Sequence, residues 1–136
     1  MEKIREEFVK KSIVKWLANN DYKISKITNK RFGVDIKAYN YNGEEYIIEC
    51  KGEVKGEGSC LDFCTGLGQL VLRMDRGLKS WKYYAIGLPD TKDFHRQINK
   101  YKKLPTNIKK FLKIRFLLVN KNGLIKECSW RNLKNN

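Results

Sequence analysis

Two acids and a lysine have the residue types needed for metal-assisted phosphodiester chemistry. Asp35 comes first, and Glu49 and Lys51 follow with a single residue between them. Two carboxylates held together repel each other, and a divalent cation relieves that repulsion. Oxygen ligands suit Mg²⁺ or Mn²⁺, and a lysine beside such a metal can orient or deprotonate a water molecule. The alternative is a partly exposed salt bridge between Lys51 and one acid, although the apolar run Tyr46-Ile47-Ile48 is unusual for a solvated edge strand.

A β-hairpin is the element that would bring these residues together. Apolar and other side chains alternate on both sides of Asn42-Gly43, which is a strong hairpin-turn signal. Glu49 and Lys51 share one face at the end of the second strand. A strict two-residue turn would place Asp35 opposite Cys50, on the other face. We therefore expect a longer loop or a bulge that shifts the register by one residue and puts Asp35 beside Glu49 and Lys51.

This order of residues resembles the PD-(D/E)XK nuclease superfamily, which has the restriction-endonuclease-like fold. The family pattern is an acid at the start of one strand and (D/E)-X-K at the end of the next, matched here by Asp35 and by Glu49-Cys50-Lys51, with Gly52 after them. Val34 stands where the name-giving motif has proline, a position that varies within the family. The resemblance implies an α/β fold in which a central mixed β-sheet is flanked by α-helices (an αβββαβ core), in a single domain spanning residues 1–136.

The resemblance also implies roles for the matched residues. Asp35 and Glu49 would hold Mg²⁺ or Mn²⁺, with the backbone carbonyl of Cys50 as a further ligand. Lys51 would position or activate the attacking water. In the resembled fold the N-terminal helix often adds a glutamate, for which Glu7 is the candidate and Glu6 the runner-up; the alternative is that both are solvated acids that complement the helix dipole.

Two helices are predicted around the hairpin. Apolar residues at helical spacing predict one helix over residues 2–19 and another over residues 60–75. In many PD-(D/E)XK nucleases the second of these carries a glutamine that reaches the site, and Gln69 matches it; the alternative is an exposed helix residue. One branch has a tyrosine where this chain has Arg73, which could contact phosphate instead. Gly66 and Gly68 predict a close approach of this helix to the sheet.

The remaining pattern predicts further strands over residues 22–28, 82–88, 114–119 and 124–130, with helices over residues 90–101 and 105–113. Strands that alternate with helices favour a mixed sheet covered by helices. Lys30 and Arg31 form a basic turn just before Asp35 and could contact nucleic-acid phosphate; a solvated loop is the alternative reading.

The formal net charge of +14 points to a polyanionic partner, with DNA as the first choice and an anionic membrane surface as the second. A lysine-rich composition without a binding role is the alternative. The chain has no apolar run of transmembrane length, and its opening MEKIREEF is unlike a secretory signal. We therefore expect a cytoplasmic (intracellular) protein without a membrane partner. The four cysteines, which form no C-x-x-C pair, are expected to be free thiols.

The sequence thus predicts a metal-dependent endonuclease that hydrolyses phosphodiester bonds of DNA. Within that class, a Holliday-junction resolvase, a flap or single-strand nuclease and a restriction or mobile-element enzyme stay open. The resolvase reading implies a homodimer, because resolvases of this fold are homodimers. The leading alternative from another class is a non-catalytic nucleic-acid-binding module of the same fold.

Overall fold

The computed structural model describes residues 3–27, 35–54, 58–74 and 81–129. Four helices and six strands lie within these ranges. In chain order they are α1 (Glu6–Asn19), β1 (Lys23–Ile27), β2 (Ile36–Tyr39), β3 (Glu45–Cys50), α2 (Gly58–Leu72), β4 (Lys82–Pro89), α3 (Lys92–Lys102), α4 (Thr106–Leu112), β5 (Arg115–Val119) and β6 (Ile125–Cys128). Each element that the sequence pattern predicts in these ranges is present. None of the helices in these ranges is long and apolar enough to cross a membrane.

All six strands form one mixed sheet in the order β1-β2-β3-β4-β5-β6. The β3–β4 and β4–β5 pairs are parallel, and the other neighbouring pairs are antiparallel. Parallel neighbours need crossover connections, which α2 supplies between β3 and β4 and which α3 and α4 supply between β4 and β5. This architecture confirms the predicted α/β class with a mixed sheet flanked by helices.

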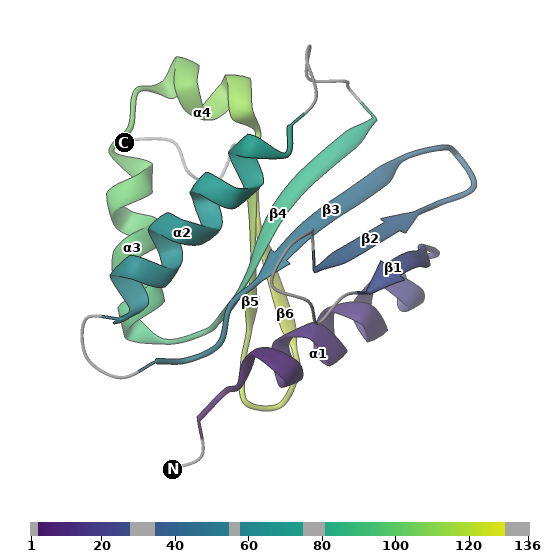
Figure 1. Ribbon diagram of the computed structural model, residues 1–136, viewed down its shortest axis with the longest axis horizontal. Coiled ribbons are helices and arrows are strands. Elements are labelled where there is room, and N and C mark those ends of the chain that lie inside the picture. The colour runs from purple at the N-terminus through teal and green to yellow at the C-terminus, as the bar shows by residue number, and fades with distance from the viewer. Residues whose placement is uncertain (1–2, 28–34, 55–57, 75–80, 130–136) are drawn as a thin grey trace.

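Helices cover both faces of the sheet (Figure 1). On one face, Val9, Ile13 and Leu17 of α1 pack against the strands, together with residues such as Ile36 and Ile48. On the other face, side chains of α2 and α3 pack against the opposite sides of the same strands, in a cluster that includes Phe63, Leu70, Ile86, Phe94 and Phe116. Because strand residues alternate between the faces, Ile47 lies in the α2 and α3 cluster while its neighbour Ile48 lies in the α1 cluster.

The hairpin has the register that the candidate site requires. β2 pairs Ile36 with Ile48 and Tyr39 with Glu45. Continuing this ladder by one residue sets Asp35 opposite Glu49, so the predicted one-residue shift is confirmed. If the turn had only two residues, Asp35 would lie opposite Cys50 and the two acids would lie on opposite faces.

The shift comes from a three-residue loop. The backbone N–H of Asn40 donates to the carbonyl of Glu44, which leaves residues 41–43 as the loop. Gly43 has φ +84°, a left-handed conformation that glycine adopts without steric cost. The side-chain Oδ1 of Asn40 accepts from the backbone N–H groups of Asn42 and Glu44. The N-x-N-G sequence over residues 120–123 forms the same hydrogen bonds between β5 and β6.

α1 begins at Glu6, later than predicted, because the preceding residues pair with the segment that follows β3. Glu53 donates its backbone N–H to the carbonyl of Ile4, over 2.7 Å. In return, the backbone N–H of Ile4 donates to the Glu53 carboxylate, over 2.9 Å. These two bonds hold the start of α1 beside the end of β3.

Candidate functional site

The two predicted acids meet where β2 begins and β3 ends. Asp35 immediately precedes β2, and Glu49 is the penultimate residue of β3. The backbone N–H of Cys50 donates to Oδ2 of Asp35 over 2.7 Å, which fixes this carboxylate against the end of β3. The backbone N–H of Lys51 donates to the carbonyl of Gly87 and extends the β3–β4 pairing past the strand end. The backbone around the acids is therefore held on both sides.

Glu49 is a buried acid with an unusual protonation equilibrium. Glu49 is 3% exposed, and its carboxylate forms an ion pair with Arg73, which follows α2. Burial, and after it the neighbouring Asp35 charge, raise the pKa of Glu49 to about 7 against the opposing effects of Arg73 and Lys51. The two neighbouring carboxylates repel each other, and a divalent cation bound between them would relieve that repulsion.

Lys10 of α1 is the site residue that sequence reasoning missed. Its Nζ lies 3.3 Å from Oδ1 of Asp35 and 3.4 Å from Oε2 of Glu6. Burial lowers the pKa of Lys10, but the charges of Asp35 and Glu6 outweigh it and raise the pKa overall. A signal was present, because Glu6 and Lys10 continue the spacing of Ile13 and Leu17 along the buried side of α1.

Two glycines let helices close onto the end of β3. A Cβ atom on Gly52 would lie 2.4 Å from the backbone nitrogen of Glu6, so α1 starts in direct contact with the glycine of the motif. A Cβ atom on Gly66 would lie 3.4 Å from Cε of Lys51, so the lysine stem runs along α2 at this point. The predicted close approach is therefore confirmed for Gly66. It is wrong for Gly68, which is exposed and has open space around it.

Gln69 lies on α2 between the positions that contact the site. Gly66 is three residues before it and touches Lys51, while Arg73 is four residues after it and pairs with Glu49. Its side-chain oxygen Oε1 is buried and has no hydrogen-bond partner among the described residues. A buried acceptor without a partner costs about 1–3 kcal/mol, so this oxygen is suited to accept a bond from water or a ligand.

The order of preference between the two N-terminal glutamates is reversed. The side chain of Glu6 reaches the charged cluster through Lys10, whereas the side chain of Glu7 makes no hydrogen bond or ion pair with another described residue. Successive helix residues are rotated by about 100°, which turns Glu7 away from the Asp35 side of α1. The other predicted nucleic-acid contacts, Lys30 and Arg31, lie outside the described residues.

The donor set fits a hard divalent cation, with one complication. No group of three or more His, Cys, Asp or Glu side chains that could hold a metal occurs within the described ranges. Mg²⁺ needs only one or two carboxylates and completes its shell with water and phosphate oxygens, so Asp35 and Glu49 suffice as protein acids. The complication is that Arg73 and Lys10 already neutralise these two acids.

Comparison with known proteins supports the class of fold. The chain is a mixed α/β protein with a helix-covered six-stranded sheet. It resembles the solved structure of an XisH family protein from Nostoc punctiforme PCC 73102 with a TM-score of 0.55, at 18% sequence identity, over 88% of this chain and 96% of that chain. At this identity the likeness concerns the fold alone. No protein-family model matches the chain, and no curated protein does.

Proposed function

We propose that this protein is a metal-dependent nuclease of the PD-(D/E)XK type, with the restriction-endonuclease-like arrangement of its sheet and helices. The observation that carries the proposal is the pairing register, which sets Asp35 opposite Glu49, with Lys51 next along the same face. The order α1-β1-β2-β3-α2-β4 supports it, because it is the αβββαβ core that the resemblance implies.

Each residue of the cluster then has a role. Asp35 and Glu49, with the carbonyl of Cys50, hold Mg²⁺ or Mn²⁺. When bound, the metal supplies Lewis-acid stabilisation of phosphoryl charge and a more acidic water. Lys51 orients or deprotonates the attacking water, and its stem is steadied by the contact with Gly66. Lys10 keeps the Asp35 carboxylate in place, and Gln69 offers a buried acceptor on α2, the helix that contacts the Lys51 stem.

One observation favours the second candidate, a nucleic-acid-binding module of the same fold without catalysis. Arg73 and Lys10 neutralise Glu49 and Asp35 without any metal, as they would in a site that had lost its catalytic role. The two candidates differ in whether the protein binds a divalent cation. The nuclease binds a divalent cation through Asp35 and Glu49, and the binding module does not.

A cleavage assay with matched variants tests the proposal. Labelled four-way junction, flap, single-strand, linear duplex and supercoiled DNA are incubated with Mg²⁺ or Mn²⁺, with EDTA as the blank. D35N is preferred to an alanine variant because the amide oxygen can still accept from the Cys50 N–H. D35N, E49Q and K51A are each expected to lose cleavage by about 100-fold or more, because the first two weaken a proposed metal ligand and the third removes the group that positions or activates water. K103A, at an exposed lysine after α3, is the control.

Circular dichroism shows whether each variant keeps the fold, and calorimetric titration with Mn²⁺ measures metal binding independently of cleavage. Cleavage by D35N at the wild-type rate would contradict the assignment. Binding of DNA without cleavage of any substrate, combined with no Mn²⁺ binding, would establish the second candidate. Paired symmetric cuts confined to the junction would identify a resolvase and imply a dimer.

A further inference from the structure

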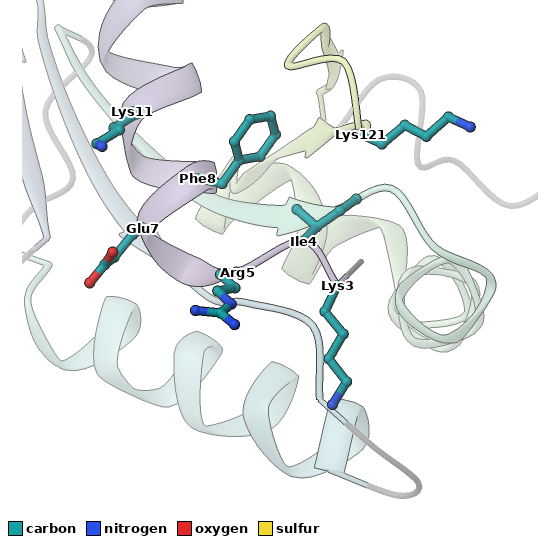
Figure 2. Close-up of a pocket in the computed structure, with 7 residues that line it drawn as sticks. All are labelled: Lys3, Ile4, Arg5, Glu7, Phe8, Lys11 and Lys121. Atoms are coloured by element: carbon teal, nitrogen blue, oxygen red, sulfur yellow. The ribbon is translucent and has the colours of Figure 1, made fainter. Parts of the chain in front are cut away.

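A second feature of the molecule is a basic pocket at the N-terminal end of α1. Its volume is about 630 Å³, within the range of pockets that hold small organic ligands. Residues from the start of α1 and from the turn between β5 and β6 meet there. We call it the α1 pocket; its lining residues are Lys3, Ile4, Arg5, Glu7, Phe8, Lys11 and Lys121 (Figure 2).

The α1 pocket concentrates positive charge that forms no ion pair with the described residues. Lys3, Arg5, Lys11 and Lys121 are all exposed, and Glu7 is the one acid among the lining residues. None of these four basic side chains forms an ion pair or hydrogen bond with another described residue. Four cations around one pocket repel one another, and a bound polyanion would relieve that repulsion.

An aromatic ring stands among these cations. Phe8 is 37% exposed, and Figure 2 shows its ring between Lys11 on one side and Lys121 on the other. A Cβ atom on Gly123 would lie 3.6 Å from Cζ of Phe8, so the tip of the ring rests against the β5–β6 turn. Ile4 adds a buried apolar surface to the same pocket. An aromatic ring with cations around it matches the chemistry of a nucleotide, which has an aromatic base and an anionic phosphate.

The pocket adjoins the candidate active site along the chain. Arg5 precedes Glu6, whose backbone nitrogen lies against Gly52 of the E-x-K-G motif and whose carboxylate binds Lys10. Phe8 lies two residues after Glu6 and projects from a different side of α1, where the tip of its ring meets the β5–β6 turn.

We propose that the α1 pocket binds a nucleotide of an unpaired nucleic-acid strand, with the base on Phe8 and the phosphates on the surrounding cations. A base inside a duplex is already stacked on its neighbours, so only an unstacked base can lie on a ring within a pocket. The binding itself does not depend on the proposed nuclease activity. The consequence for substrate choice does rest on the proposed nuclease activity. Substrates with a single-stranded part, such as flaps, would be cleaved in preference to uninterrupted duplex.

The test is an anisotropy measurement in EDTA, so that no cleavage occurs. Fluorescein-labelled oligo-dT and a duplex of equal length are titrated with wild type, F8L and K121Q. The leucine keeps apolar bulk against Gly123 but removes the stacking face. F8L is expected to weaken oligo-dT binding by at least about fivefold and to leave duplex binding unchanged. K121Q is expected to reduce the slope of log K against log salt by about 0.7, the value for one phosphate contact on a single strand.

Matched controls use the same substitutions elsewhere. F111L changes a more exposed phenylalanine on α4, and K103Q removes an exposed lysine after α3; neither is expected to alter oligo-dT binding. Thermal melting establishes that F8L is folded. Inorganic polyphosphate, added as a competitor, separates a phosphate site from a nucleotide site.

The outcomes separate the two proposals. Oligo-dT affinity of F8L equal to that of wild type, or an equal loss on the duplex, would overturn the nucleotide pocket. So would full displacement by polyphosphate at the same phosphate concentration as oligo-dT. If F8L binds oligo-dT as wild type does while wild type cleaves DNA, the nuclease proposal stands and the nucleotide pocket is refuted. If F8L loses oligo-dT binding while wild type cleaves no substrate, the nucleotide pocket is supported and the nuclease proposal is refuted.

Discussion

At the residue scale, the candidate site is a charge cluster that is balanced without metal. When every member is ionised, three acids face three bases: Glu6, Asp35 and Glu49 against Lys10, Lys51 and Arg73. The balance is fragile because Glu49 is buried and its pKa is about 7. Near neutral pH a proton, Arg73 and a metal ion all compete for the same carboxylate.

The pKa of Glu49 predicts how stability changes with pH in EDTA. Its folded-state pKa of about 7 lies above the ordinary value of 4.5, so its contribution to stability is full below pH 4.5 and is lost as pH rises through 7. E49Q stays neutral and lacks this loss. The difference in the free energy of unfolding, E49Q minus wild type, is therefore expected to increase by about 3 kcal/mol between pH 4.5 and pH 8.5. Urea denaturation at a series of pH values measures the difference.

Asp35, Arg73 and Lys51 are the charged groups that face Glu49, so variants at these positions should shift the midpoint of that curve. E45Q, at the other end of β3, serves as the matched control and should follow wild type. A constant offset between E49Q and wild type across the whole range would show that Glu49 is ionised throughout.

Arg73 is predicted to weaken metal binding. Its guanidinium forms the ion pair with Glu49, so a cation that uses this carboxylate must displace it. R73A is expected to bind Mn²⁺ about tenfold more tightly at pH 8, a change of about 1.4 kcal/mol. R96A removes an exposed arginine paired with Asp93 on α3 and should leave the affinity unchanged. Weaker Mn²⁺ binding by R73A, measured calorimetrically, would mean that Arg73 orients Glu49 instead of competing for it.

At the element scale, the site depends on how closely α1 and α2 approach the end of β3. Gly52 touches the first backbone atoms of α1, and Gly66 touches the stem of Lys51. The paired bonds between Ile4 and Glu53 hold the same junction. These contacts set the distance between the charged side chains of α1 and those of the hairpin.

Two glycine-to-alanine variants test this arrangement with opposite expected signs. G52A places a methyl group against backbone atoms, which cannot move aside as a flexible side chain can, so a loss of about 1–3 kcal/mol is expected. G68A adds a methyl group in open space within α2 and is expected to stabilise the protein by about 0.5–1 kcal/mol. Chemical denaturation of both variants gives the comparison, and an unchanged stability of G52A would refute the close contact.

At the scale of the whole molecule, the net charge of +14 makes the folded chain repel itself. Raising NaCl from 20 to 200 mM screens this repulsion, while the partly buried pairs at Asp35 and Glu49 are screened much less. The melting temperature is therefore expected to rise by about 2–5 °C. Scanning calorimetry measures it. A falling melting temperature would mean that surface ion pairs stabilise the protein more than its net charge destabilises it.

Local patterns determined much of this protein. Period-two alternation around Asn42-Gly43 predicted the hairpin, and the face shared by Glu49 and Lys51 followed from the strand period alone. These are short-range properties, because the backbone fixes which neighbours point the same way. The register itself was predicted from the requirement that Asp35 join them, and the three-residue loop confirms it.

Only the tertiary structure decided which partners the acids have. Lys10 lies on α1 and Arg73 directly follows α2, and these helices pack on opposite faces of the sheet. No local pattern states how either helix is rotated about its axis when it packs. That rotation set Glu6, and not Glu7, beside Lys10, and the packing of α1 against the β5–β6 turn placed Lys121 at the α1 pocket. The choice depends on contacts between residues far apart in the chain, such as Gly52 with Glu6 and Gly87 with Ile13, which exist only after the helices have packed.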